Sequence, residues 1–173
     1  MPEPFLHGER VTLRPVTDDD LDPLAEIIAS PGVRDWWGEV DEPDRLRDNL
    51  RSHPDQHYTA FVIQVSGEIA GWLGVSEETE PEYKSAGLDI SLAPRFQGQG
   101  LGPEALRTAI GWLASERGHH RFTIDPAVAN ENAIKAYEAA GFKPIGIARR
   151  QERAPDRTWR DALLMDLLAE ELD

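Results

Sequence analysis

The stretch Gln97-Gly98-Gln99-Gly100-Leu101-Gly102 follows an alternating, strand-like segment at residues 86–92 and precedes a helix-like run that starts at Pro103. Three glycines in five positions let the backbone turn sharply and leave its N–H groups uncovered by side chains. Pro103 suits a first helical position, so the turn leads into a helix N-terminus. Free N–H groups and the positive end of a helix dipole together bind anions. We therefore expect a phosphate-bearing ligand at this loop.

The spacing of the glycines separates this loop from other phosphate-binding loops. A P-loop requires Lys-Ser or Lys-Thr after the last glycine, where this chain has Pro103-Glu104, and a dinucleotide fold requires G-x-G-x-x-G in its first βαβ unit. Gln97, Gly100 and Gly102 resemble the Q/R-x-x-G-x-G/A signature of the GCN5-related N-acetyltransferase (GNAT) superfamily. The resemblance implies that all six residues of the loop hold the pyrophosphate of acetyl-coenzyme A. A purely structural left-handed turn is the alternative interpretation.

A second segment, residues 125–142, resembles the second half of the same family motif. Asn130 suits a helix N-cap and Gly141 suits the position after the helix end. Tyr137 follows Asn130 by seven residues, on a face that it shares with Ala133, Ala136 and Ala140. The resemblance implies that Tyr137 protonates the departing thiolate and that Asn130 contacts the cosubstrate near its pantetheine arm. Alternatively, Tyr137 is an ordinary core aromatic.

Composition narrows the class of protein. The 173 residues suit one domain, 1–173, and the absence of cysteine excludes disulfides and a thiol acyl-enzyme. The net charge of −14 argues against nucleic-acid or membrane partners and favours a small cationic amine as substrate. Acidic clusters at residues 18–20 and 77–82 are interpreted as solvated surface. We expect no metal, a cytoplasmic location because no signal-peptide pattern is present, and a monomer or homodimer.

Periodicity predicts an α/β (α+β) protein. Strands are expected at residues 10–16, 58–65, 68–75, 85–92, 121–125, 143–150 and 159–167, and helices at 17–28, 43–51, 103–117 and 130–140. This order resembles the GNAT fold over nearly the whole chain. The resemblance implies a mixed, mostly antiparallel twisted sheet of about seven strands, flanked by about four helices and splayed between its fourth and fifth strands.

The resemblance also places the acetyl-transfer site at this splay. The backbone of Ile90, Ser91 and Leu92 would hold the pantetheine arm and polarise the acetyl carbonyl. Asp89 and Asp125 would lie at the ends of the two strands, buried by their neighbours, with one of them accepting the amine proton. Two alternatives stay open, because Asp89 could point to solvent and Asp125 could be a strand-end Asp-Pro turn. Which aspartate is the base is also left open.

The acceptor is predicted from Asp35-Trp36-Trp37-Gly38. One tryptophan is expected in the core and the other exposed beside carboxylates, where an indole suits a flat polycationic ligand. This segment, together with Asp89 and Asp125-Pro126, resembles the aminoglycoside 6′-N-acetyltransferases, which implies that Trp36, Trp37, Asp89 and Asp125 bind the antibiotic. The opening residues 8–15 equally resemble enzymes that acetylate protein N-termini, and siderophore hydroxylysine acyltransferases share much of the pattern. The arginines within residues 149–160 are interpreted as surface pairing rather than as a binding site.

Overall fold

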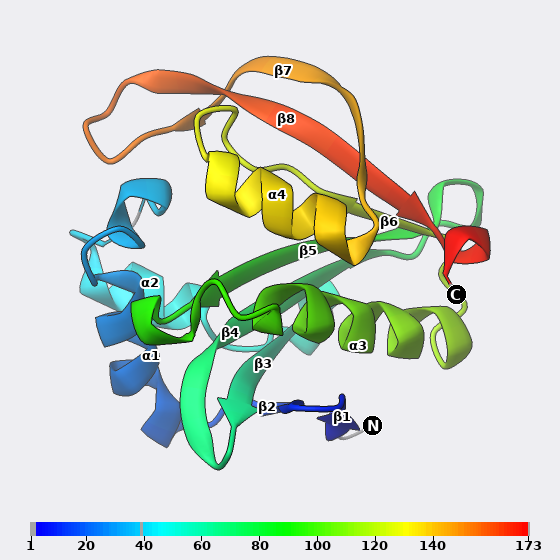
Figure 1. Ribbon diagram of the computed structural model, residues 1–173, viewed down its shortest axis with the longest axis horizontal. Coiled ribbons are helices and arrows are strands. Elements are labelled where there is room, and N and C mark those ends of the chain that lie inside the picture. Colours follow the sequence, from blue (N-terminus) through cyan, green and yellow to red (C-terminus); the bar gives the residue numbers. More distant parts are fainter. Residues whose placement is uncertain (1–2, 39, 173) are drawn as a thin grey trace.

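The computed structural model describes residues 3–38 and 40–172 and contains one eight-stranded sheet (Figure 1). The strands are β1 (Leu6–His7), β2 (Val11–Pro15), β3 (Tyr58–Val65), β4 (Glu68–Glu78), β5 (Ser85–Leu92), β6 (Arg121–Ile124), β7 (Lys143–Arg153) and β8 (Trp159–Leu168), in the spatial order β1-β2-β3-β4-β5-β6-β8-β7. All neighbours are antiparallel except β5 and β6. The predicted mixed sheet is confirmed, with β1 as an additional strand.

Helices cover both faces of the sheet. They are α1 (Leu21–Ile28), α2 (Pro43–Asn49), α3 (Leu101–Ser115) and α4 (Glu131–Ala140). Apolar side chains of α3 and α4, including Leu106 and Ile110, pack on one face against Phe61 and Phe122. Side chains of α1 and α2 form a second core with Trp72 on the opposite face. The predicted α/β architecture is therefore confirmed, and no helix among residues 3–38 and 40–172 is long and apolar enough to cross a membrane.

Helix ends lie near the capping residues of the sequence, with shifts at α1 and α3. The Thr17–Asp20 capping box opens a 3-10 helix, η1 (Asp18–Asp20), and α1 follows it from Leu21, so the predicted first helix begins as a 3-10 turn. The Asn130 side chain accepts a hydrogen bond from the Ala133 N–H at the start of α4. Helix α3 begins at Leu101 instead of Pro103, so the proline is the third helical residue. Proline is tolerated there because the first N–H groups of a helix have no intrahelical partner. The glycine loop therefore runs directly into the first turn of α3.

Two members of the acidic clusters are buried in ion pairs, which corrects their interpretation as solvated surface. Asp20 pairs with Arg14 through two hydrogen bonds of 2.7 and 2.8 Å. The Glu77 side chain, only 4% exposed, accepts hydrogen bonds from Arg117 and from the fully buried His119. Burial alone would raise the pKa of Glu77, but the hydrogen bonds from Arg117 and His119 lower it below its ordinary value of 4.5. Glu77 therefore joins β4 to the end of α3.

The parallel pair β5 and β6 is the point where the sheet opens. The two strands pair only at Ala86↔Phe122 and Gly87↔Thr123. Beyond Gly87, β5 continues to Leu92 paired with β4 alone. The predicted splay is therefore confirmed, and it leaves one edge of the outer half of β5 without a neighbouring strand.

Candidate active site

The glycine loop lies between a short 3-10 helix, η5 (Pro94–Phe96), and α3. Gly98 and Gly100 have φ angles of 73° and 79°, in the left-handed region that favours glycine. Within the described backbone, the N–H groups of residues 98–102 donate to no acceptor of the chain. The Gln97 side chain donates to the Leu92 carbonyl at 2.9 Å and so ties the loop to the end of β5. The loop thus offers unpaired backbone donors at a helix N-terminus, which is the arrangement that binds phosphate groups.

The free edge of β5 lies beside this loop. Ser91 is buried, whereas Ile90 and Leu92 are half-buried. Gly102 approaches the Leu92 side chain closely enough that a Cβ on the glycine would lie 3.5 Å from Leu92 Cδ1. The loop and the strand edge are therefore contiguous. An extended ligand with phosphates at one end can bind both surfaces at once.

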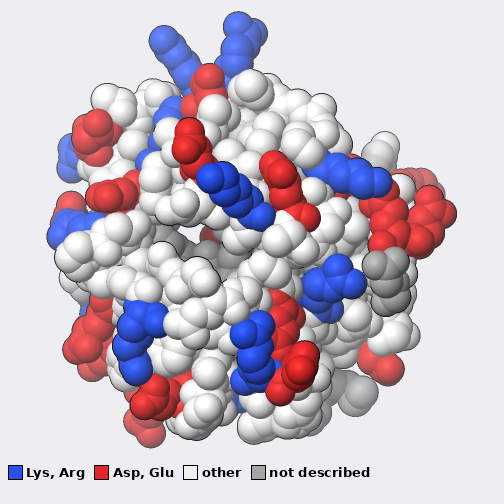
Figure 2. Space-filling view, viewed as in Figure 1, with Lys and Arg blue, Asp and Glu red and all other residues white. Residues whose placement is uncertain are grey.

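A cavity of about 970 Å³ lies at the splay, and Figure 2 shows that the face of the molecule carrying α3 and α4 is hollowed near its centre. Its walls come from the segment after α1, from α2, from β3–β6, from the start of α4 and from the β7–β8 hairpin. Four carboxylates line it: Asp48, Asp89, Asp125 and Glu152. Six aromatic side chains also line it: Trp36, Trp37, Tyr58, Trp72, Tyr137 and Trp159. Such a cavity suits a cationic ligand with flat apolar surfaces.

Tyr137 reaches the cavity from the buried face of α4. The residue is 8% exposed, and Asn130 and Gly141 fix the two ends of its helix. Burial, together with the nearby carboxylates of Asp89 and Asp125, raises the pKa of Tyr137 far above its ordinary value of 10. The phenol is therefore fully protonated at neutral pH. It is an O–H donor at the site, and Asn130, which also lines the cavity, orients its helix.

The two aspartates line the same cavity, but they are not buried as expected. Asp89 and Asp125 are both exposed, because the diverging strands leave their side chains in the open space of the cavity. Asp89 Oδ1 accepts a hydrogen bond of 3.0 Å from the Ile90 N–H. Asp125 accepts a hydrogen bond from the Gln151 amide. Both carboxylates are thus accessible to an acceptor amine.

The surroundings of Asp125 make its carboxylate more basic than that of an ordinary aspartate. The cavity walls partly desolvate it and Glu152 adds a like charge, so its pKa is raised above the ordinary 3.8, against the opposing hydrogen bond from Gln151. A carboxyl group with a raised pKa binds a proton more tightly. Asp125 is therefore better suited than an ordinary aspartate to take a proton from an ammonium group.

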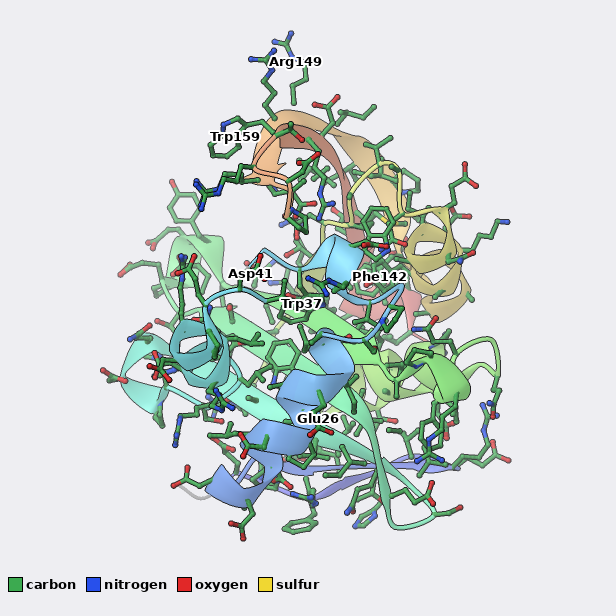
Figure 3. All side chains as sticks on the ribbon, turned by 90° about the vertical axis from the view of Figure 1, so that its left-hand side faces the viewer. Glu26, Trp37, Asp41, Phe142, Arg149 and Trp159 are labelled. Carbon is green, nitrogen blue, oxygen red and sulfur yellow. The ribbon has the colours of Figure 1, made fainter. Side chains whose placement is uncertain are left out.

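Both tryptophans of the Trp-Trp segment are half-buried, so neither is a simple core residue or a fully exposed platform. Trp37 packs edge-on against Trp72, with ring centroids 5.4 Å apart, and it lies below the segment that carries it (Figure 3). Trp36 belongs to a short 3-10 helix, η2 (Arg34–Trp36), and the Arg160 guanidinium lies 5.1 Å from its ring centroid. One face of Trp36 is therefore already occupied by a cation of the protein.

The late arginines divide between cavity and surface, which corrects their interpretation as surface pairing alone. Arg160 donates to Glu152 at 2.7 Å and to the Asp35 carbonyl at 2.9 Å, and so it joins the β7–β8 hairpin to η2. Arg153 lines the cavity. Arg149 points away from the body of the molecule, whereas Trp159 projects from the same hairpin (Figure 3). The hairpin is thus a wall of the site.

Several lining residues were not predicted from the sequence. Asp48 on α2, His53 and Tyr58 near the start of β3, and Gln151 and Glu152 on β7 all reach the cavity. No local motif marks them. Gln151 and Glu152 reach the cavity because β8 pairs with β6 and carries β7, whereas Asp48, His53 and Tyr58 reach it because α2 and β3 pack against β4. Among these unpredicted lining residues, only Trp159 stands out in the sequence, as an isolated aromatic residue in a charged hairpin that could have been named as a binding residue. Among the described residues no group of three His, Cys, Asp or Glu side chains could hold a metal ion.

The splayed mixed sheet with helices on both faces is the architecture of an acyltransferase class. Residues 10–143 match the family model of the acetyltransferase (GNAT) domain. The chain belongs to this family, and it is an acetyl-CoA-dependent N-acetyltransferase. The resemblance stated from the two sequence motifs is therefore confirmed.

Individual relatives differ in the acceptors for which they are named. The chain is 30% identical over 156 residues to aminoglycoside N(6′)-acetyltransferase type 1 of Klebsiella pneumoniae, covering 80% of this chain and 77% of that protein. It is 27% identical over 140 residues to a putative ribosomal protein bS18-alanine N-acetyltransferase of Bacillus subtilis, covering 81% and 85%. Among solved structures it is similar to AAC(6′)-Ib in complex with paromomycin and acetyl-CoA, with a TM-score of 0.78, 25% identity and coverage of 94% and 96%.

Proposed function

We propose that the enzyme transfers the acetyl group to a primary amine of a small polycationic molecule, with the 6′-amine of an aminoglycoside antibiotic as the acceptor. The observation that carries the proposal is the cavity at the splay, which four carboxylates and six aromatic side chains line, Tyr137 among them. The similarity to the Klebsiella pneumoniae aminoglycoside enzyme supports the same acceptor class. Inactivation of the drug would then confer resistance.

The donor site is assigned to the loop and the free strand edge. The unpaired N–H groups of residues 98–102 would hold the pyrophosphate, with Gln97 and Gln99 shaping the loop through hydrogen bonds to the carbonyls of Leu92 and Arg95. The backbone of residues 90–92 would hold the pantetheine arm, with Asn130 on the facing wall. When bound, acetyl-CoA supplies an acetyl group activated as a thioester. The residues of the chain then only orient the reactants and move protons.

Two proton movements are assigned to residues of the cavity. Asp125, or Asp89 on the facing strand, accepts the proton of the acceptor ammonium so that the amine becomes nucleophilic. The Tyr137 hydroxyl donates its proton to the departing sulfur. Its raised pKa keeps the hydroxyl protonated at neutral pH and also makes it a weaker acid, so its proton moves only as negative charge develops on the sulfur. The amine attacks the carbonyl carbon of the acetyl thioester within a ternary complex, since the chain has no cysteine to form a thiol acyl-enzyme. The acidic lining binds the remaining ammonium groups of the acceptor.

A second acceptor class, the N-termini of proteins, is favoured by one observation. Arg45 and Arg153 also line the cavity, and these cations suit an acceptor that carries carboxylates as well as an amine. The relative from Bacillus subtilis is named for such an acceptor. The four carboxylates outnumber the two arginines, however, so the polycationic acceptor is the better match for the cavity.

The proposal is tested by thiol release from acetyl-CoA with kanamycin, tobramycin, amikacin, gentamicin, polyamines and N-terminal peptides. We expect turnover with kanamycin and none with paromomycin, in which the 6′ position carries a hydroxyl group. Turnover with peptides alone would overturn the aminoglycoside assignment and leave the donor site standing. The single domain, the cytoplasmic location and the monomeric or homodimeric state stay predictions of the sequence.

A further inference from the structure

The turn between β1 and β2 is docked on the first turns of α3. The Gly8 N–H donates to the Val11 carbonyl at 2.8 Å and closes the turn. A Cβ on Gly8 would lie only 2.8 Å from Thr108 Oγ1 and 3.1 Å from Glu104 Oε1, so the turn approaches the helix as closely as a glycine permits. This contact brings Arg10, the next charged residue of the turn after Glu9, to the side of the glycine loop.

Arg10 makes three hydrogen bonds there. Its backbone N–H and its Nε donate to the two carboxylate oxygens of Glu104, at 2.5 and 3.0 Å. Its Nη1 donates to the Gln99 carbonyl at 2.8 Å. A Cβ on Gly100 would lie 3.3 Å from Arg10 Nη2, so the guanidinium also lies against the glycine. Glu104 thus fixes the direction of Arg10, and Arg10 fixes a carbonyl inside the donor loop.

That carbonyl controls the direction of a backbone donor. The Gln99 C=O and the Gly100 N–H belong to one planar trans peptide, so they point to opposite sides of the backbone. Holding the carbonyl on Arg10 therefore turns the Gly100 N–H away from Arg10. Gly100, which follows this peptide and has a positive φ, would otherwise let the peptide rotate more freely than any other residue would.

We infer that Arg10 is a positioning residue of the donor site: it locks the Gln99–Gly100 peptide so that the Gly100 N–H is preorganised for the diphosphate of acetyl-CoA. The inference rests on the donor site proposed above. Arg10 acts through the loop and does not need to touch the ligand. Glu104 balances its charge, so the shape of the guanidinium fork matters more than the charge itself.

The test compares two acetyl donors. Acetyl-CoA carries the diphosphate, whereas S-acetylpantetheine has the same thioester and pantetheine arm without it. In Arg10→Gln and Arg10→Lys we expect the KM for acetyl-CoA to rise about tenfold, consistent with weakening one hydrogen bond to a charged group, with kcat unchanged. With S-acetylpantetheine, kcat/KM should equal that of the parent. Arg95→Gln is the matched control, because Arg95 adjoins the same loop but pairs with Glu68 at the surface.

The outcomes separate this inference from the proposed function. Equal losses of kcat/KM with both donors would mean that Arg10 has a general structural role. No loss with either donor would mean that the loop keeps its conformation without Arg10. Each of these results overturns the inference. Calorimetric binding of CoA and of pantetheine to parent and variants gives the same comparison without any acceptor. A wrong acceptor assignment therefore leaves the Arg10 test intact, and failure of the parent to bind CoA would overturn the donor site and this inference together. If the Arg10→Gln variant does not fold, the same comparison is made with Arg10→Lys, which keeps the positive charge.

Discussion

Replacing Tyr137 by phenylalanine removes the proposed proton donor and leaves the ring in place. A positioned general acid contributes roughly 10²–10⁴-fold to a rate. The cavity of about 970 Å³ has room for water, which can donate a proton in place of the lost hydroxyl. We therefore expect an effect at or below the low end of that range, a fall in kcat of about 10- to 100-fold, which is about 1.4–2.7 kcal/mol of transition-state stabilisation.

The structure also predicts what Tyr137→Phe leaves unchanged. The ring is 8% exposed and packs with the α3 core, so the packing survives and the free energy of unfolding should change by about 1 kcal/mol or less. The substitution leaves the proposed phosphate-binding loop unchanged, so the Kd for CoA should stay within about twofold, well under one tenfold step of affinity. Tyr83→Phe, at a residue that is 76% exposed, is the control.

The assay is steady-state thiol release with the acceptor identified in the panel, together with thermal unfolding and CoA calorimetry on the same samples. A kcat within about twofold of the parent, far below the effect of a general acid, would refute the assignment of Tyr137 as proton donor. A parallel loss of CoA affinity and thermal stability would instead assign Tyr137 to the core. Only a selective fall in kcat supports the reasoning.

The base and the aromatic segment give two further predictions. Glu152→Gln removes the like charge that raises the pKa of Asp125, so Asp125 should lose its proton at a lower pH and the acid limb of kcat/KM should move to lower pH. Asp125→Asn should abolish the acid limb of the kcat/KM profile if Asp125 is the base. If only Asp89→Asn abolishes it, Asp89 is the base. An acid limb that persists in both variants places the base elsewhere. Trp36→Ala should raise the acceptor KM with little change in Tm, whereas Trp37→Ala should lower Tm because it removes the contact with Trp72. If Trp36→Ala instead lowers Tm and Trp37→Ala raises the acceptor KM, then Trp36 is the structural residue and Trp37 the one that contacts the acceptor.

Most of the fold was predictable because its local signals agree with one another. The strands at residues 58–65 and 85–92 match β3 and β5 as predicted, since alternation and the flanking turns bound them on both sides. The two-residue β1 was missed because two residues carry no periodicity, and only its pairing with β2 makes it a strand. Glu77 was misread for a related reason. Its burial depends on Arg117 and His119, about 40 residues away in the chain.

The site was predictable where a motif is local and not where the site depends on long-range pairing. The glycine loop and Tyr137 could be proposed as site residues because each lies in one contiguous segment with its own turn or cap. Glu152 and Arg153 line the cavity only because β8 pairs with β6 and carries the hairpin across it. The burial of Asp89 was overestimated, because alternation within β5 says nothing of how far β6 diverges from it.

The charges of the two half-sites differ in a way that predicts opposite salt dependences. A chain with a net charge of −14 must bind a donor that carries phosphates, and in the proposed donor site the loop would do so with uncharged N–H groups and an Arg10 that Glu104 neutralises. The acceptor cavity instead carries four carboxylates against two arginines. Between about 0.05 and 0.5 M KCl the Debye length shortens by about threefold, which weakens the attraction of a polycation to the cavity. The acceptor KM should therefore rise several-fold, whereas the KM for acetyl-CoA should stay level or fall, because screening also removes the repulsion between the acidic protein and its anionic donor. A parallel rise of both KM values would show that charge on the loop binds the donor, and the assignment of that role to backbone N–H groups would be wrong.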